Sequence, residues 1–117
     1  MRISKWFTRE EMACGCGCGF DSIDVETLQL ADECRDFVGV PITPSSVSRC
    51  AEYNQEIGGA ERSQHVFARA MDLPVPDPEA LYEYLNENYP NKYGIGLYNT
   101  FVHIDTRTDG PARWDLR

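Results

Sequence analysis

Residues 94–107 read GIGLYNTFVHIDTR and contain the clearest strand pattern in the sequence. Phe101, His103 and Asp105 alternate with residues that are aliphatic or β-branched. Because successive side chains of a strand point to opposite faces, this period of two predicts a strand over Thr100–Thr106. The preceding segment, Gly94–Leu97, is the other strand candidate in this stretch.

Three segments upstream carry helix signals. Asp24 is placed to cap a helix that runs to Val38 and stops at Gly39. A second helix is predicted to begin at Asp77–Glu79, where a capping residue, a proline and an acid follow one another. A shorter helix is expected over Ser48–Ile57, before a pair of glycines.

The order of these segments predicts the fold class. Short strand-like runs at Val40–Thr43 and Met71–Leu73 separate the helices, which favours the α+β class over a doubly wound α/β sheet. A chain of 117 residues has the size of one domain. We therefore predict a single α+β domain over residues 1–117, with a central antiparallel sheet and flanking helices. Four aromatic side chains have two interpretations, the lining of a glycan groove or packing, and packing is expected in so small a domain: Trp6, Tyr53, Tyr98 and Trp114.

Composition narrows the functional classes. The net charge is −8 and there is no run of Lys and Arg, whereas phosphate-binding surfaces need clustered basic residues. Nucleic acid is therefore not an expected partner. No stretch approaches the roughly 20 apolar residues of a membrane helix, and the N-terminal run MRISKWFTREEM lacks the apolar core of a secretion signal. We expect no membrane partner, and synthesis in the cytoplasm without a signal peptide.

The two histidines of the chain are the strongest chemical signal. His65 precedes Asp72 by seven positions, and His103 lies within the predicted strand. Zinc binds imidazole nitrogen and carboxylate oxygen, and a catalytic zinc keeps three protein ligands and one open position. The three residues would supply such a set. From residue types alone, hydrogen-bonded histidines and a surface acid remain the alternative.

The residues around His65 resemble a known motif. The zinc D-Ala-D-Ala carboxypeptidase and L-alanyl-D-glutamate endopeptidase family of murein peptidases carries Ser-x-His-x-x-Gly-x-Ala-x-Asp, which residues 63–72 match except at Ala68. The second motif of its small phage-type members resembles Gly94–Tyr98 followed by Phe101–Arg107. The segment Trp6–Glu11 also looks like those members. Ala68 should be tolerated in place of glycine unless the position needs a positive φ.

The resemblance implies a fold and a function. The fold would be that of the hedgehog and DD-peptidase domains, with a zinc cleft, and His65, Asp72 and His103 would be the zinc ligands. The implied activity is hydrolysis of an amide bond in the peptide part of peptidoglycan, by a D-Ala-D-Ala carboxypeptidase or a murein endopeptidase. A phage or prophage endolysin-like enzyme is expected, monomeric and acting at the cell wall after release.

Other site residues have two readings each. Asp105 shares a strand face with His103 and is the candidate catalytic residue, as general base, with a partner that orients the histidine as the alternative. Some relatives place the base three residues before the second histidine, where this chain has Thr100. The segment Ser46–Arg49 departs from the Ser-Gly-Tyr-Arg of the family. Arg49 is nevertheless expected to bind a substrate carboxylate, with a structural ion pair as the alternative. Ser63 would bind substrate or stabilise its loop.

The five cysteines suggest a second feature. Cys14, Cys16 and Cys18 alternate with glycines, and Cys34 and Cys50 follow. Disulfides or a Cys-ligated structural zinc would both use them, and we expect a clip from Cys14 or Cys18 to Cys50. Two alternatives to an enzyme remain. One is a non-catalytic zinc-containing binding module, such as the hedgehog domain, and the other is a disulfide-stapled interaction domain without metal.

Overall fold

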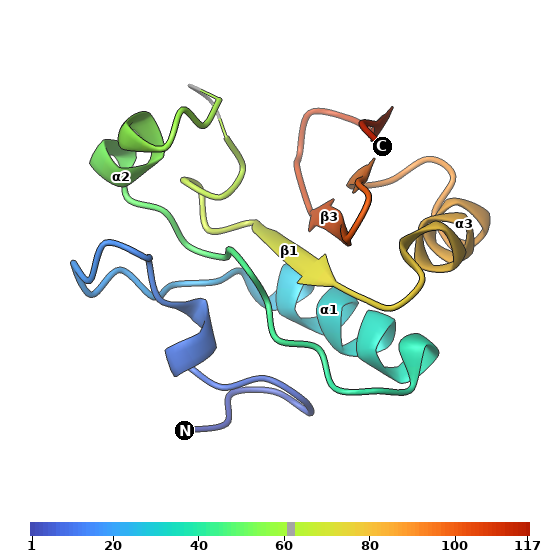
Figure 1. Cartoon of the computed structure of the whole chain (residues 1–117), viewed down its shortest axis with the longest axis horizontal. Coiled ribbons are helices and arrows are strands. Elements are labelled where there is room, and N and C mark those ends of the chain that lie inside the picture. Colours follow the sequence, from blue (N-terminus) through green and yellow to red (C-terminus); the bar gives the residue numbers. More distant parts are fainter. Residues whose placement is uncertain (61–62) are drawn as a thin grey trace.

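Four short strands form one mixed sheet at the centre of the molecule (Figure 1). The computed structural model of the chain describes residues 1–60 and 63–117. The order across the sheet is β1-β3-β2-β4, and β3 runs antiparallel to both β1 and β2. The strands are β1 (Ala70–Pro74), β2 (Gly94–Leu97), β3 (Phe101–Asp105) and β4 (Ala112–Asp115). The α+β class is confirmed.

The prediction of a purely antiparallel sheet is wrong at β4. The chain reverses direction after β3, but β4 then pairs with β2 instead of β3. Since β2 is antiparallel to β3, a strand that reverses from β3 and pairs beyond β2 must run parallel to β2. No strand was expected over Ala112–Asp115, where arginine, tryptophan and aspartate give no clear alternation.

The helices begin where the caps predict. They are α1 (Val25–Val38), α2 (Ala51–Glu56) and α3 (Pro78–Asn88), with a 3₁₀ turn, η1, at Glu10–Met12. The Asp24 carboxylate accepts from the backbone of Glu26, and Gly39 ends α1 with φ +78°. Asp77 caps α3 through the backbone of Ala80. Side-chain caps and a left-handed glycine therefore set the ends of these helices, as expected.

Two expected elements differ. The helix over Ser48–Ile57 is shorter, because Cys50 is its N-cap and α2 begins only at Ala51. The run Val40–Thr43 is not a strand. This segment meets the sheet only further along the chain, where Ser46 forms a single antiparallel bridge to Asp72 on the free edge of β1. This bridge places the segment that leads to α2 beside β1.

The two faces of the sheet have opposite characters. Val102 and Ile104 of β3 are fully buried in a core that includes Leu28 of α1 and Leu81 and Leu85 of α3. Burying each such side chain stabilises the fold by about 1.5–3 kcal/mol. Figure 1 shows α1 along one side of β1 and α3 beside β3. The residues between the apolar ones therefore face away from these helices, and this second face carries the polar groups.

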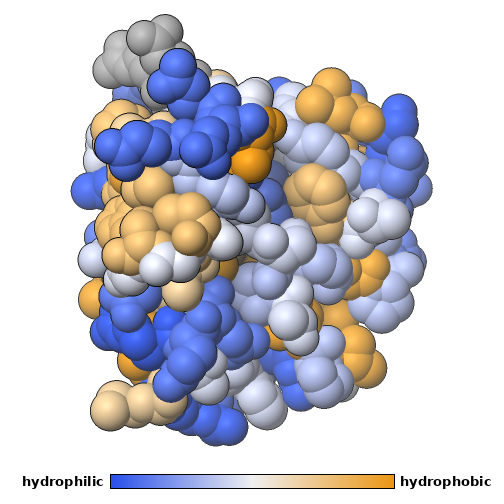
Figure 2. All heavy atoms as spheres, turned by 60° about the vertical axis from the view of Figure 1, so that its left-hand side comes forward, coloured by the Kyte–Doolittle hydropathy of each residue, from blue (hydrophilic) through white to orange (hydrophobic). Residues whose placement is uncertain are grey.

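The surface above α2 and the N-terminal loop is mixed in character. Figure 2, which brings this side of the molecule forward, shows hydrophilic and hydrophobic atoms interspersed over it. Within residues 1–60 and 63–117, no helix has the length and apolar character needed to cross a membrane.

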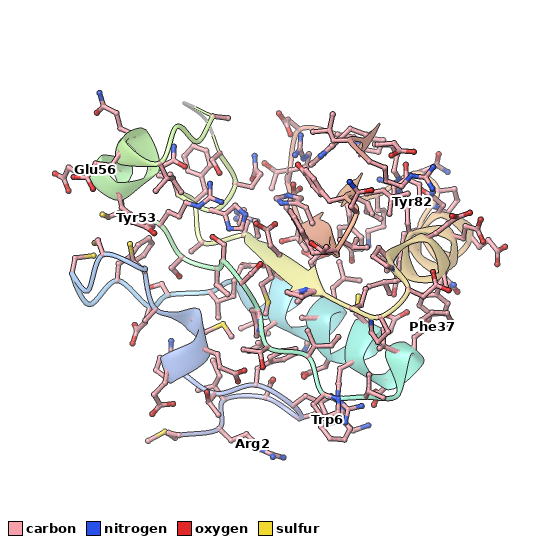
Figure 3. All side chains as sticks on the ribbon, in the orientation of Figure 1. Arg2, Trp6, Phe37, Tyr53, Glu56 and Tyr82 are labelled. Carbon is pink, nitrogen blue, oxygen red and sulfur yellow. The ribbon has the colours of Figure 1, made fainter. Side chains whose placement is uncertain are left out.

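The N-terminal segment packs against α1 and completes the core. Phe7 and Met12 are fully buried. Trp6, labelled in Figure 3, donates through Nε1 to Asp36 at 2.8 Å and has the Arg35 guanidinium 4.0 Å from its ring centroid. Trp6 therefore serves packing, as predicted.

Ala68 occupies a position that favours glycine. It lies in the loop before β1 with φ +58°, in the left-handed region. This is the condition under which the departure from the glycine of the family motif is costly, because the Cβ crowds the neighbouring carbonyl. Ala68→Gly is expected to raise the free energy of unfolding by about 1 kcal/mol, as measured by urea denaturation.

Ala51→Gly is the matched control for this prediction. Ala51 is exposed in the first turn of α2, with right-handed backbone, so glycine there should lower stability by roughly 0.5–1 kcal/mol. Equal destabilisation by the two changes would contradict the assigned conformation of Ala68.

Candidate metal centre

The register of the sheet places Asp72 directly opposite His103. The two residues are Cα partners across the antiparallel pair β1–β3, so both side chains emerge on the face away from α1 and α3. His65 comes from the loop that precedes β1. All three are buried, with between 2% and 8% of their surface exposed.

The donor atoms of these residues converge. The Asp72 Oδ1 atom lies 2.9 Å from Nδ1 of His103 and 3.3 Å from Nε2 of His65. The ligand atoms of the three residues all lie within 4.8 Å of one another. The structure thus brings together the three residues that the sequence predicts as zinc ligands.

His65 presents a nitrogen without a hydrogen-bond partner. Its Nδ1 lies 2.6 Å from the backbone carbonyl of Val47, and because a carbonyl only accepts, Nδ1 carries the proton. In the neutral ring Nε2 then holds a lone pair. It is buried and forms no hydrogen bond. Buried polar atoms rarely lack a partner, and an imidazole fixed through its other nitrogen is the usual arrangement of a zinc ligand.

Asp72 is held as a carboxylate. Burial alone would raise its pKa, but the hydrogen bond with His103 and the nearby imidazole of His65 outweigh this effect and hold the pKa well below its usual range. The second oxygen, Oδ2, lies 3.8 Å from the Arg49 guanidinium. The site therefore contains an ionised oxygen ligand between two imidazoles, a donor set that fits zinc.

His103 is oriented by Asp105. Nε2 of His103 lies 2.7 Å from Oδ2 of Asp105, which leaves Nδ1 facing Asp72. Burial alone would lower the pKa of His103, but its hydrogen bonds with Asp105 and Asp72 raise it. Metal binding would require Nδ1 to release its proton, while Nε2–H still donates to Asp105 and fixes the ring, as in other carboxylate–histidine–zinc arrangements.

Asp105 itself is fully buried and saturated with donors. Arg107 contacts it through Nε at 2.8 Å and Nη2 at 2.7 Å, and the backbone N–H groups of Arg107 and Gly94 also donate to it. Burial would raise its pKa, but hydrogen bonds with Arg107 and His103 hold the pKa well below its usual range. Asp105 does not line the cleft described below.

Two glycines of β2 make room for this arrangement. A Cβ at Gly94 would lie 2.4 Å from both carboxylate oxygens of Asp105. A Cβ at Gly96 would lie 2.2 Å from Nε1 of Trp114, whose ring packs 5.1 Å from that of His103. Both glycines lie on the face of the sheet that carries His103 and Asp105, where there is no room for a side chain.

A cleft of about 600 Å³ opens over the three ligands. Arg49 and Ser63 lie on its wall, as expected for substrate contacts. Arg49 is held by Ser46 and by Asn54, each at 3.1 Å, and Ser63 accepts from the backbone of His65. Arg49 also lies 3.8 Å from Asp72, so it combines a place on the cleft wall with an ion pair inside the site.

The comparison with protein families agrees with the geometry. A family model described as Peptidase M15 matches residues 5–105. The chain belongs to the peptidase M15 family. This is the zinc D-Ala-D-Ala carboxypeptidase family that the two motifs resemble, and M15 peptidases are zinc-dependent. A search of curated proteins found none similar enough in sequence to report.

The M15 cleft contains residues that the sequence analysis missed. Tyr98 and Trp114 were assigned to packing, yet both line it, together with Phe101. The rings of Tyr98 and Phe101 stack at 4.2 Å, and Trp114 donates to the Tyr98 hydroxyl. Asp109, on the loop between β3 and β4, adds an exposed carboxylate to the rim. The sequence alone could not show that these residues share a cleft, because Trp114 approaches Tyr98 only through the pairing of β4 with β2.

The expected disulfide clip is not formed in the M15 domain. All five cysteines are free. The sulfurs of Cys14 and Cys50 lie 3.9 Å apart, well beyond the roughly 2.05 Å of a disulfide. The predicted proximity of the N-terminal loop to Cys50 is nevertheless confirmed, whereas Cys34 is fully buried in the core.

Proposed function

We propose that this M15 chain hydrolyses an amide bond in the peptide part of peptidoglycan. The observation that carries the proposal is the unpartnered Nε2 of buried His65, which faces Asp72 and His103 at the floor of an open cleft. Membership of the M15 family supports a zinc peptidase acting on peptidoglycan in general.

The three ligands would hold zinc through Nε2 of His65, a carboxylate oxygen of Asp72 and Nδ1 of His103. When bound, zinc polarises the scissile carbonyl and lowers the pKa of its water from about 15.7 toward 7. The chain supplies the rest: fixed histidine orientations, a charged wall and a group that accepts a proton.

Asp105 acts in this proposal as a positioning residue for His103. Its oxygens already accept from His103, from Arg107 and from two backbone N–H groups. A general base needs a free lone pair within reach of the water that it activates. A fully buried carboxylate outside the cleft lining lacks that access, so we assign Asp105 the orienting role of the two foreseen for it.

We propose Asp109 as the general base. Of the described residues that line the cleft, Asp72 and Asp109 carry carboxylates, and Asp72 is engaged by both histidines. Asp109 is exposed on the rim of the cleft. It can therefore accept a proton from water in the cleft and pass it to the leaving amine.

Asp109→Asn is expected to lower kcat about 100-fold or more, because the amide cannot accept the proton. The KM for substrate and the zinc content should stay close to those of the parent. Asp115→Asn, an exposed carboxylate of β4 outside the cleft lining, is the control and should leave kcat unchanged. Steady-state rates on a soluble muropeptide check this, and an unchanged kcat for Asp109→Asn would remove it from the mechanism.

Arg49 is proposed to bind a substrate carboxylate. Muropeptides end in free carboxylates, and a guanidinium forms paired hydrogen bonds with such a group. Arg49 is only 14% exposed at its side chain and is aligned by Ser46 and Asn54, so little ordering is needed on binding. Ser63 holds the loop of His65 and, on the cleft wall, is proposed to contact substrate as well.

The bond that is cut decides whether the enzyme is a carboxypeptidase or an endopeptidase. We propose a D-Ala-D-Ala carboxypeptidase or a murein endopeptidase, of the phage or prophage endolysin-like kind, that acts at the cell wall. The test is digestion of purified peptidoglycan by zinc-loaded protein, with mass spectrometry of the products. Release of terminal D-Ala identifies a carboxypeptidase, and new internal termini identify an endopeptidase. If no muropeptide is cleaved while zinc is bound, the chain is instead a zinc-containing binding module.

A further inference from the structure

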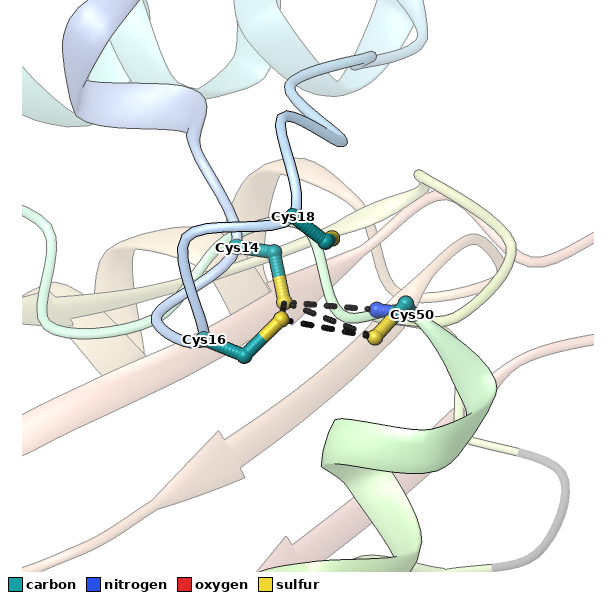
Figure 4. Close-up of side chains that lie close together, drawn as sticks. All are labelled: Cys14, Cys16, Cys18 and Cys50. Carbon is teal, nitrogen blue, oxygen red and sulfur yellow. Dashed lines mark hydrogen bonds between the residues drawn. The ribbon is translucent and has the colours of Figure 1, made fainter.

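A second group of metal-ligating side chains lies outside the M15 centre. Cys14, Cys16 and Cys18 on the N-terminal loop and Cys50 at the start of α2 have sulfurs that all lie within 4.8 Å of one another (Figure 4). They come from segments more than 30 residues apart in sequence. The proposed hydrolysis uses none of them.

The separations of the sulfurs fit a tetrahedral metal site. Cys14 and Cys16 lie 3.4 Å apart, Cys16 and Cys50 3.6 Å, and Cys14 and Cys50 3.9 Å. Zinc binds thiolate at about 2.3 Å, and the corners of such a tetrahedron are about 3.8 Å apart. Disulfides would instead draw the sulfurs into pairs at roughly 2.05 Å. Three mutual contacts close to the tetrahedral edge therefore favour a metal over a pairwise bridge.

The backbone around the cluster is arranged for charged sulfur. The N–H of Cys50 donates to the sulfur of Cys14 at 3.5 Å, and the N–H of Tyr53 donates to the sulfur of Cys50 at 3.4 Å. Such bonds stabilise thiolates, which are the form that binds metal. The carbonyl of Phe20 accepts from the N–H of Cys14 at 2.7 Å and closes the loop.

The loop is packed tightly but remains open to metal from solvent. Tyr53 of α2, labelled in Figure 3, lies so close that a Cβ at Gly15 would be 2.7 Å from its hydroxyl. Cys16 and Cys18 are exposed, whereas Cys14 is buried. The cluster therefore has a fixed inner side and an accessible outer side.

We propose that Cys14, Cys16, Cys18 and Cys50 bind a structural zinc ion. The four thiols would release their protons to solvent on binding, so that Zn²⁺ and four thiolates form a closed site of net charge −2. With all four positions taken by sulfur, this ion has no place for water and no catalytic role. It ties the N-terminal loop to the residue that follows Arg49, and so braces the wall of the cleft.

Cobalt replacement tests this site without any activity assay. Reduced protein loaded with Co²⁺ is expected to show sulfur-to-cobalt charge-transfer bands and the intense visible bands of tetrahedral cobalt, with two ions bound per chain. His65→Ala should lose one ion and keep the sulfur bands. Cys18→Ser should weaken cobalt binding at the sulfur site by at least about tenfold. Cys34→Ala, in the core and outside the cluster, should keep both ions and the bands.

Two results would overturn the proposal. One is a reduced wild-type protein that binds cobalt without any sulfur band. The other is a purified protein, isolated with thiols blocked, in which the four cysteines are found as two disulfides. Both results are obtained with the wild-type sequence, so they do not depend on whether a variant folds. Zinc at the sulfur site with no peptidoglycan cleavage would support this inference and contradict the proposed function.

Discussion

His65→Ala is expected to remove the zinc of the M15 centre and to lower kcat/KM by about a thousandfold or more. The imidazole is the one ligand of the three with no other partner for its metal-facing nitrogen, so its loss leaves only Asp72 and His103. Metal analysis should find one zinc fewer per chain, and turnover of a muropeptide should fall with it.

Gln64→Ala is the matched control. Gln64 precedes His65 in the same loop and lines the cleft, but it does not belong to the ligand set. Its variant should therefore keep the zinc. If His65→Ala retained full zinc content while the control behaved as expected, the assignment of the metal centre would be wrong.

Asp105→Asn is expected to weaken zinc binding about 10- to 100-fold, the usual effect of losing a carboxylate behind a ligand histidine. The asparagine oxygen can still accept from His103, so most of kcat should return at saturating zinc. A general base behaves differently, because its loss lowers kcat at every zinc concentration. Rates measured across a zinc titration distinguish the two roles, and an unrecovered kcat would restore Asp105 as the base.

Asp105→Ala is expected to lower the free energy of unfolding far more than Asp105→Asn. Asp105→Ala leaves the partly buried guanidinium of Arg107 without its carboxylate, and breaking such a pair costs about 3–5 kcal/mol, an upper range here because Arg107 retains some solvent. Asp115 and Arg117 form the same pair two residues apart on the exposed end of β4. Asp115→Ala should change stability little, since exposed pairs contribute little.

Local signals in the sequence predicted the helices and the metal ligands. Asp24, Gly39 and Asp77 act on the backbone within a few residues of themselves, so their roles can be recognised without the tertiary structure. His65, Asp72 and His103 were found through motifs that join a loop to two strands. The fold then needed only the antiparallel register of β1 and β3 to bring them together.

The features that the sequence did not reveal depend on contacts between distant segments. β4 is parallel because it pairs past β2, which no local pattern encodes. Trp114 reaches His103 only because Gly96 lies between them on the sheet. The backbone of Ala68 is left-handed although alanine itself disfavours it, which shows that the surrounding loop decides the conformation.

The roles of Asp105 and the cysteines needed side-chain surroundings. Asp105 was expected on the same face as His103, but its saturation by Arg107 and two N–H groups could not be seen in the spacing. The cysteine spacing allowed disulfides or metal equally. The near-equal separations of the sulfurs favour the metal.

The most direct test of a zinc hydrolase is digestion of purified peptidoglycan in heavy-oxygen water, followed by mass spectrometry of the released peptides. We predict that zinc-loaded protein cuts a peptide bond and leaves one heavy oxygen in the new carboxylate, and that His65→Ala leaves the peptides intact. Intact peptides after incubation with the zinc-loaded parent, or products equally abundant with His65→Ala, would contradict the proposed function.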